Sequence, residues 1–161
     1  MSDAPPPPLA ERTLDSFTRR LGSTAITPGS GSAAAVTLAL AAGCLRKAAV
    51  ITLKRRDDPD LQRLADEAAA LAAAALAGAE EEAESFRALL AAASHAVEEV
   101  LEVADGLTMC AAALLDLAER LEGRVEAVVA GDLLAARALT GAAQQILAAN
   151  KAEAERARTA P

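Results

Sequence analysis

Apolar residues recur at steps of three and four along most of the chain, and this spacing predicts α-helices. Turn-forming residues interrupt the pattern, namely a Gly-rich stretch after residue 21, Asp57-Asp58-Pro59, and Gly123. Asp58 suits the N-cap of a new helix, and Pro59 suits its first position. The pattern predicts an all-α bundle of about five helices, at about 9–21, 31–56, 59–90, 97–121 and 125–147.

The second predicted helix, residues 31–56, carries small or aliphatic side chains on every side of its first half. A helix of this kind is usually buried on all sides, so we expect it to be the buried, Ala-rich central helix of the bundle. Five helices of short to medium length leave part of such a surface uncovered. An uncovered apolar face favours self-association, and we therefore expect a homodimer.

The composition strengthens the all-α prediction and excludes some functions. The chain of 161 residues contains 45 Ala, and aromatic residues make up only 1% of it. Ala favours helices and is depleted in strands. Modules that stack bases on aromatic side chains are excluded. The net charge of −7 argues against general nucleic-acid binding, so we expect no nucleic-acid partner.

The chain reads as one domain over residues 9–158, preceded by a disordered Pro-rich tail at residues 1–8. The longest apolar run, Ala33 to Leu45, is too short to span a bilayer, and no signal peptide is visible. Cys44 and Cys110 form no metal-binding spacing and suit a reducing compartment. We expect a cytoplasmic protein with no membrane association.

The charges are segregated along the sequence. Residues 16–56 contain seven basic residues and no acid, whereas the segment that follows is strongly acidic. A basic sector beside a Gly-rich helix start is a plausible anion site. The alternative is charge complementarity within the chain or across a dimer.

A Gly-rich turn that leads into an Ala-rich helix is the most informative stretch. Glycines let the backbone approach a ligand closely, and the first N–H groups of a helix are unpaired donors. A tight turn with close helix packing is the alternative explanation. The stretch reads Thr27-Pro28-Gly29-Ser30-Gly31-Ser32-Ala33-Ala34-Ala35.

This stretch resembles the Thr-Pro-Gly-Gly-Gly-Ser-Ala-Ala-Ala signature of the cyclodeaminase/cyclohydrolase family of folate enzymes. Other segments resemble that family in the same order along the chain. They are Leu14-Asp15-Ser16-Phe17, the Ile51–Arg56 stretch, Glu81-Glu82-Ala83-Glu84-Ser85-Phe86, and Ala130-Gly131-Asp132-Leu133 with the Thr140–Ala143 stretch that follows.

The resemblance implies a homodimeric helical bundle with a folate site near the subunit interface. It implies the activity of a methenyltetrahydrofolate cyclohydrolase or a formimidoyltetrahydrofolate cyclodeaminase, with a tetrahydrofolate derivative as substrate and no bound cofactor. Both reactions act at the one-carbon bridge between two folate nitrogens. Hydrolysis needs a general base, and cyclodeamination needs a proton for the departing ammonia.

The resemblance also implies roles for individual residues. Asp132, Glu82 and Lys54 are the candidate catalytic residues. The candidate substrate-binding residues are Thr27, Pro28, Gly29, Ser30, Gly31, Ser32, Arg55 and Arg56. The alternatives are a helix N-cap for Asp132 and a solvated surface charge for Glu82. No metal site is expected, because His95 is the only histidine and suits an exposed helix junction.

Several positions depart from the family pattern. Ser30 replaces the middle Gly of the signature, the Tyr after the basic cluster is absent, and the Val103–Gly106 stretch lacks the family's Pro. Of the two closing asparagines, Gln145 falls near the first, and Ala149 or Asn150 falls near the second. These differences keep a second hypothesis open, a catalytically silent helical dimer that binds a folate, another anion or a protein partner.

Overall fold

The computed structural model describes residues 7–91 and 95–159 and shows an all-α protein, as predicted. Within the described residues, five α-helices and two short 3₁₀ helices follow one another without a strand. The elements are η1 (Leu9–Glu11), α1 (Leu14–Leu21), α2 (Ser30–Leu53), α3 (Pro59–Leu90), α4 (Ala96–Leu121), η2 (Ala127–Val129) and α5 (Ala130–Thr159). Of the predicted tail at residues 1–8, only Pro7 and Pro8 lie within the described residues.

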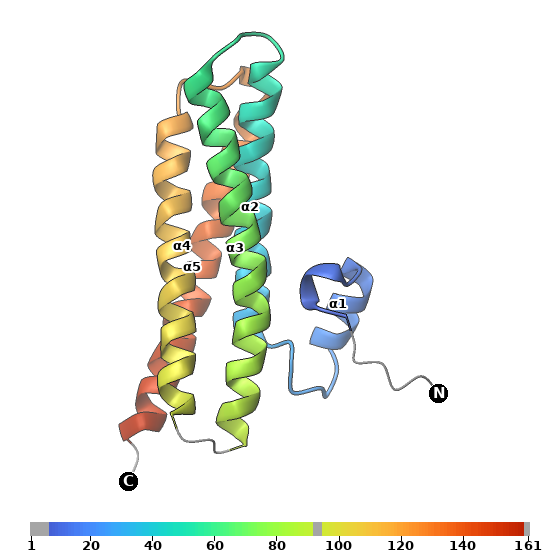
Figure 1. The fold of residues 1–161 in the computed structure, drawn as a ribbon, viewed down its shortest axis with the longest axis vertical. Helices are drawn as coiled ribbons and strands as arrows, with labels where there is room; N and C mark the ends of the chain where they lie inside the picture. Colours follow the sequence, from blue (N-terminus) through green and yellow to red (C-terminus); the bar gives the residue numbers. More distant parts are fainter. Residues whose placement is uncertain (1–6, 92–94, 160–161) are drawn as a thin grey trace.

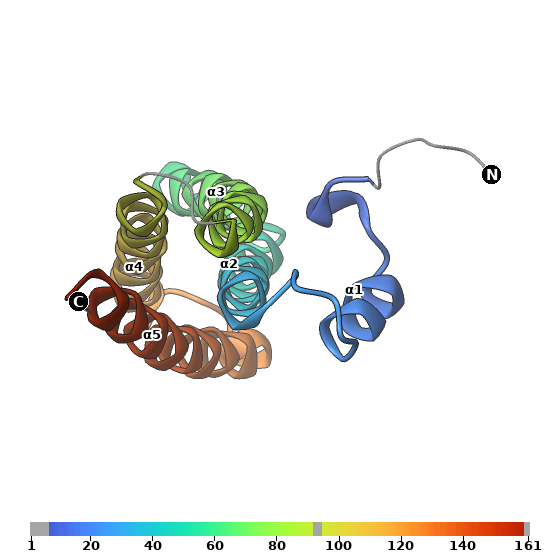
Figure 2. The ribbon, with the colours of Figure 1, turned by 90° about the horizontal axis from the view of Figure 1, so that it is seen from below.

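The four long helices α2 to α5 run up and down in turn and form one bundle (Figure 1). An end-on view shows them as a ring, with α1 outside it on the side of α2 (Figure 2). Helix α2 packs most extensively on α3 and α5. The N-terminal segment contacts the bundle through η1 and α3, where the Leu9 N–H donates to Glu80 Oε2 at 2.7 Å.

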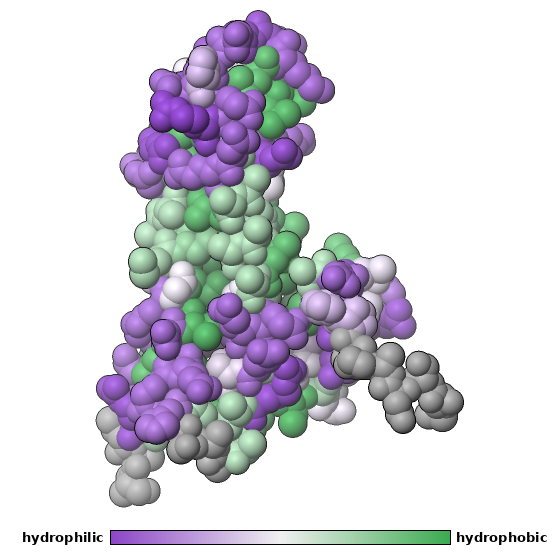
Figure 3. All heavy atoms as spheres, viewed as in Figure 1, coloured by the Kyte–Doolittle hydropathy of each residue, from purple (hydrophilic) through white to green (hydrophobic). Residues whose placement is uncertain are grey.

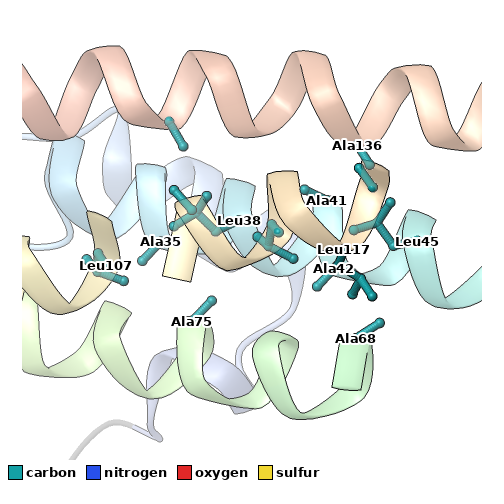
Figure 4. Close-up of a cluster of buried hydrophobic side chains, with 14 of the residues drawn as sticks. Ala35, Leu38, Ala41, Ala42, Leu45, Ala68, Ala75, Leu107, Leu117 and Ala136 are labelled. Atoms are coloured by element: carbon teal, nitrogen blue, oxygen red, sulfur yellow. The ribbon is translucent and has the colours of Figure 1, made fainter. Parts of the chain in front are cut away.

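Small side chains let the helices of the bundle approach closely. The core alternates Leu with many Ala, as the close-up of its side chains shows (Figure 4). Gly78 on α3 is part of this fit, because a Cβ at that position would lie 2.7 Å from Leu107 Cδ2 of α4. Leu38 and Leu45 of α2 are fully buried and fill the space that these small residues leave.

Helix α2 supplies much of the core, as predicted, yet one stripe of it stays open. Val36, Leu40, Gly43 and Lys47 follow one another at helical spacing and are exposed or half-buried, with Leu40 55% exposed. By length and composition α2 is the one described helix that could cross a membrane, but 44% of its most apolar stretch is buried in the bundle. Buried core helices of other proteins can be equally long and apolar, so this finding does not assign α2 to a membrane.

The first two helices differ in extent from their predicted ranges. The 9–21 segment divides into η1 and α1, because Arg12 and Thr13 are extended and the Thr13 side chain caps α1 by accepting from the Ser16 N–H. Helix α2 ends at Leu53 rather than 56. The Arg55 N–H there donates to the Thr52 carbonyl at 3.0 Å, which closes a tighter last turn. Asp58, the residue before Pro59, is extended at φ −143° and ψ 99°.

Two of the predicted boundaries further along the chain are confirmed, the start of α3 and the end of α4. The last predicted helix, 125–147, instead divides into η2 and α5, and α5 begins at Ala130 and continues to Thr159. The Asp58 carboxylate accepts from the Asp60 and Leu61 N–H groups, and Pro59 begins α3. Gly123, directly after α4 and its C-cap residue, has a φ of 69°, which glycine adopts without strain. His95 is exposed at the start of α4, the junction predicted for it, while Ser94 lies outside the described residues.

Small side chains are common on the surface of the bundle as well as in its core. On the face shown in Figure 3, a band of apolar side chains separates two hydrophilic ends. Helix α3 crosses this face, and its exposed Ala residues are Ala70, Ala73, Ala74 and Ala77. On this face the hydrophilic residues therefore gather at the two ends of the bundle.

Candidate functional site

The Gly-rich turn places the start of α2 inside the molecule. Gly29 is extended at the N-cap, and the first helical hydrogen bond runs from the Ala33 N–H to the Gly29 carbonyl at 3.0 Å. The N–H groups of the residues between them are therefore free of helical partners. Gly31 and Ser32 are buried, so their N–H groups lie at the end of the bundle interior, whereas Ser30 is exposed.

Glu82 of α3 lies directly against this helix start. A Cβ on residue 31 would lie 2.3 Å from Glu82 Oε1 and 2.5 Å from its carboxyl carbon, so the glycine makes room for the carboxylate. The Ser32 hydroxyl lies 2.5 Å from Glu82 Oε2, and its oxygen is also 3.2 Å from the Ala79 carbonyl. The carboxylate is thus fixed by a short hydrogen bond beside the positive end of a helix dipole.

A cavity of about 310 Å³ opens over this carboxylate. It lies between the start of α2, the end of α3, the start of α4 and the last part of α5. Its lining residues are Gly29, Ser30, Glu82, Phe86, Leu89, Val100, Asn150, Glu153, Ala154 and Ala157. Apolar walls with a few convergent polar groups are typical of small-molecule sites.

Asn150 of α5 completes the polar side of this cavity. The Ser30 hydroxyl donates to Asn150 Oδ1 at 3.1 Å, and this bond ties the Gly-rich turn to α5. Of the two positions that the sequence left open, Asn150 faces the site, whereas Ala149 is exposed outside the cavity lining.

The next residue, Lys151, does not line this cavity. It donates a hydrogen bond to Asp105, and this bond raises the pKa of the lysine.

Thr27 and Pro28 are buried and form the wall on the other side of the same turn. The Arg20 Nε–H donates to the Thr27 carbonyl at 2.9 Å, and Arg87 Nη1 donates to Thr27 Oγ1 at 2.8 Å. These two residues line a separate cavity rather than the one above Glu82. Thr27 and Pro28 therefore act by positioning Gly29 and Ser30, which do line the cavity above Glu82.

The remaining candidates lie at the opposite end of the bundle (Figure 1). Helix α2 has 24 residues, so its two ends are about 36 Å apart at a rise of about 1.5 Å per residue. Lys54, Arg55 and Arg56 follow its C-terminus. Arg55 pairs with Glu126 at 3.1 Å, while Lys54 is exposed. Within one chain, the structure does not bring this basic stretch to Glu82.

Asp132 is also at that end, in the first turn of α5. Its Oδ1 lies 3.1 Å from Lys47 Nζ, and the Asp132 side chain is 21% exposed while that of Lys47 is 61% exposed. Asp132 lies inside α5 and so does not take the N-cap position that was its alternative assignment. Lys47 carried no signal in the sequence beyond its membership of the basic segment.

A larger groove of about 800 Å³ runs between α3 and α4. Small residues and carboxylates line it, among them Glu81, Glu84, Glu99 and Glu102. None of these four carboxylates has a hydrogen bond or ion pair within the described residues. Unpaired acidic side chains such as these usually form a solvated surface. The smaller cavity is the better candidate site, because its carboxylate, Glu82, is held in place by Ser32.

Comparison with known proteins assigns the chain to a family. The model of the family described as formiminotransferase-cyclodeaminase matches residues 13–151. The chain belongs to the formiminotransferase-cyclodeaminase family. The match includes the Gly-rich turn, Glu82, Asp132 and Asn150, so both ends of the bundle lie within the family domain.

A solved structure shares the fold of this family member. The crystal structure of formiminotetrahydrofolate cyclodeaminase from Thermotoga maritima has a TM-score of 0.87 at 20% sequence identity, over 92% of this chain and 80% of that chain. At this identity the likeness establishes the fold, and the activity remains to be argued from the site. The comparison with curated proteins gave no match.

Proposed function

We propose that this protein is a folate one-carbon enzyme that acts at the bridge between two folate nitrogens, with Glu82 as its acid/base group. The Glu82 carboxylate carries the proposal, because it is held 2.5 Å from the Ser32 hydroxyl at the polar wall of a cavity of ligand size. A tetrahydrofolate derivative is the substrate in this proposal, and no bound cofactor takes part.

In the cyclodeaminase reaction, one folate nitrogen attacks the formimino carbon and a new carbon–nitrogen bond closes the bridge. The bond from that carbon to the terminal nitrogen breaks, and ammonia leaves with a proton that a general acid supplies. Glu82 is placed to hold and transfer that proton. Asn150 and the free N–H groups of the turn supply fixed dipoles around the bridge.

The cyclohydrolase reaction uses the same groups in a different order. Water adds to the bridge carbon while a general base accepts its proton, and one carbon–nitrogen bond then opens. Cyclodeamination is the first activity to test, because the family model and the solved relative both bear that name. The cyclohydrolase reaction is the second.

We propose further that a homodimer completes the site. A two-fold axis perpendicular to α2 near Leu40 and Gly43, close to the middle of that helix, would place two copies of α2 antiparallel. The C-terminal end of one α2 would then lie near the Gly-rich turn of the partner. Lys54, Arg55, Arg56 and the Lys47–Asp132 pair would thereby join Glu82 from across the interface. The open stripe of α2, which is apolar at Val36 and Leu40, supports this arrangement.

The proposal includes a cytoplasmic location. Cys44 and Cys110 are both free thiols, and folding does not pair them. Half-buried thiols of this kind are typical of a reducing compartment.

The test is turnover of formimidoyltetrahydrofolate by the purified protein, followed as growth of methenyltetrahydrofolate absorbance and release of ammonia. Glu82→Gln keeps the shape of the side chain but removes the acid, and we expect its kcat to fall by about 10² to 10⁴. Glu81→Gln is the matched control, because Glu81 is the exposed neighbour on the same helix. We expect its kcat to stay within about twofold of wild type.

If neither formimidoyltetrahydrofolate nor methenyltetrahydrofolate is converted, the enzyme proposal fails. The silent-homologue hypothesis then stands, and binding of a folate to the cavity above Glu82 becomes the next measurement. The substitutions at Ser30 and Gln145, relative to the family pattern, favour this second outcome.

A further inference from the structure

A second cavity of about 310 Å³ lies on the other side of the Gly-rich turn from Glu82. The N-terminal segment, Thr27 and Pro28 of the turn, and the α3 face that carries Glu80, Ala83 and Arg87 enclose it. Its volume is at the lower end of the range for small-molecule sites. It shares no lining residue with the cavity above Glu82.

Three arginines from three separate elements converge on this cavity. Arg12 follows η1, Arg20 belongs to α1 and Arg87 belongs to α3. Within the described part of the chain, none of the three forms an ion pair with a carboxylate, although most other basic residues do. Unpaired guanidinium groups gathered at one cavity are unexpected in a protein with a net charge of −7.

Among the residues that the structure describes, each of these guanidinium groups donates once, and each time to a neutral oxygen. The acceptors are the Pro7 carbonyl for Arg12 at 2.9 Å, and the carbonyl and hydroxyl of Thr27 for Arg20 and Arg87. An arginine has several N–H donors in a planar fork, so most of the donors at this cavity are left over. These protein contacts fix the arginines without neutralising them.

Glu80 is the one carboxylate among the described residues that line the cavity, and it does not cancel this charge. Glu80 Oε2 accepts from the Leu9 N–H at 2.7 Å, which fastens η1 onto α3. Glu80 has no ion pair with any of the three arginines. Three positive charges against one negative charge leave the cavity cationic.

We propose that this cavity is a binding site for a small oxyanion ligand, one that presents a phosphate or a carboxylate group. Guanidinium forks bind both groups through paired, charge-assisted hydrogen bonds. The site goes beyond the proposed folate reaction, because it lies outside the cavity above Glu82. A bound anion would clamp the N-terminal segment to α3 through arginines from both.

Titration calorimetry on the purified full chain, with inorganic phosphate and with glutarate as separate probes at constant ionic strength, tests the site. We expect at least one probe to bind, and the tighter one identifies the group that the cavity takes. Arg87→Gln should weaken that binding by at least about tenfold. Arg12→Gln should do the same without touching Thr27, which guards against a disturbed turn. Far-ultraviolet circular dichroism verifies that both variants remain helical.

Arg19→Gln is the control, since Arg19 neighbours Arg20 on α1 but pairs with Asp15 away from the cavity. It should bind the probe within about twofold of wild type. Absence of binding by both probes overturns the proposal. Equal weakening in the Arg19, Arg12 and Arg87 variants also overturns it, because the effect would then be diffuse charge rather than a built site.

Discussion

The carboxylate of Glu82 fills the space next to Gly31 that a side chain at residue 31 would need, since a Cβ there would lie 2.3 Å from Glu82 Oε1. The glycine therefore serves a side chain 51 positions further along the chain rather than the conformation of its own backbone. This relationship explains why the helix start contains Gly at a position where Ala would be the better helix former.

Gly31→Ala should abolish most activity while leaving the fold intact. The added methyl group displaces a flexible carboxylate rather than backbone, so we expect kcat to fall by at least about tenfold with a change in stability below about 1 kcal/mol. Gly106→Ala is the control, because an added Cβ at that exposed position of α4 meets nothing within 4 Å. Kinetics and thermal unfolding of both variants test this prediction, and an active Gly31→Ala protein would contradict it.

Truncation of Leu38 should show how much the thin core depends on its few large side chains. Leu38 is fully buried among Ala residues that cannot fill the gap, so Leu38→Ala should lower the free energy of unfolding by about 2–5 kcal/mol. Met109→Ala on the 74% exposed surface of α4 should cost less than about 0.5 kcal/mol. Urea denaturation compares the two, and similar midpoints would refute the prediction.

Charge placed on the open stripe of α2 should separate the proposed dimer. We expect light scattering to give twice the chain mass of 16.3 kDa for the wild type and the monomer mass for Leu40→Glu. Met109→Glu adds the same charge to α4 and should remain dimeric. A wild-type protein that is monomeric at micromolar concentration would remove the interface from the proposal.

Acid should weaken the turn between α2 and α3 through Asp58. The Leu61 N–H donates to its carboxylate, and Arg124 lies 3.3 Å away, so these contacts hold the Asp58 pKa below the ordinary value of 3.8. A depressed carboxyl pKa stabilises the fold above the unfolded pKa, and this stabilisation is lost as pH falls through the folded pKa.

Asp58→Asn keeps the helix cap but removes the titrating group. Its thermal midpoint should therefore fall less than that of the wild type between about pH 5 and about pH 3. Asp57→Asn in the same turn should follow the wild type, since the Asp57 carboxylate forms no hydrogen bond or ion pair within the described residues. Parallel curves for Asp58→Asn and the wild type would show that this carboxylate does not link stability to pH.

The helices were predictable from the sequence because their signals are local. The Asp58-Pro59 start of α3 and the Gly123 stop of α4 rely on chemistry between near neighbours, and both were confirmed. The break between η1 and α1 was missed, because apolar spacing from Leu9 to Leu21 runs across an extended Arg12.

The site was harder to predict because its parts lie far apart in the sequence. Family resemblance brought Glu82 and the Gly-rich turn forward, but the Ser32–Glu82 hydrogen bond spans 50 positions and no local pattern encodes it. The same resemblance grouped Asp132 with Glu82. Sequence motifs do not show how far apart two residues lie along the bundle, and in one chain these two lie at opposite ends of it. Either Ala149 or Asn150 could have matched the second closing asparagine of the family. The rotation of α5 turns Asn150 toward the site, where it bonds to Ser30, and leaves Ala149 exposed.

The length of α2 has a consequence for mixtures of variants. Because about 36 Å of helix separates the Glu82 end from the Asp132 end, each complete site in the proposed dimer takes one end from each subunit. Glu82→Gln and Asp132→Asn would both be inactive alone. In hybrid dimers, one site collects both defects while the other is fully wild type. Mixing and reassembling the two inactive proteins should therefore restore turnover, with about half of the dimers being hybrids after random exchange.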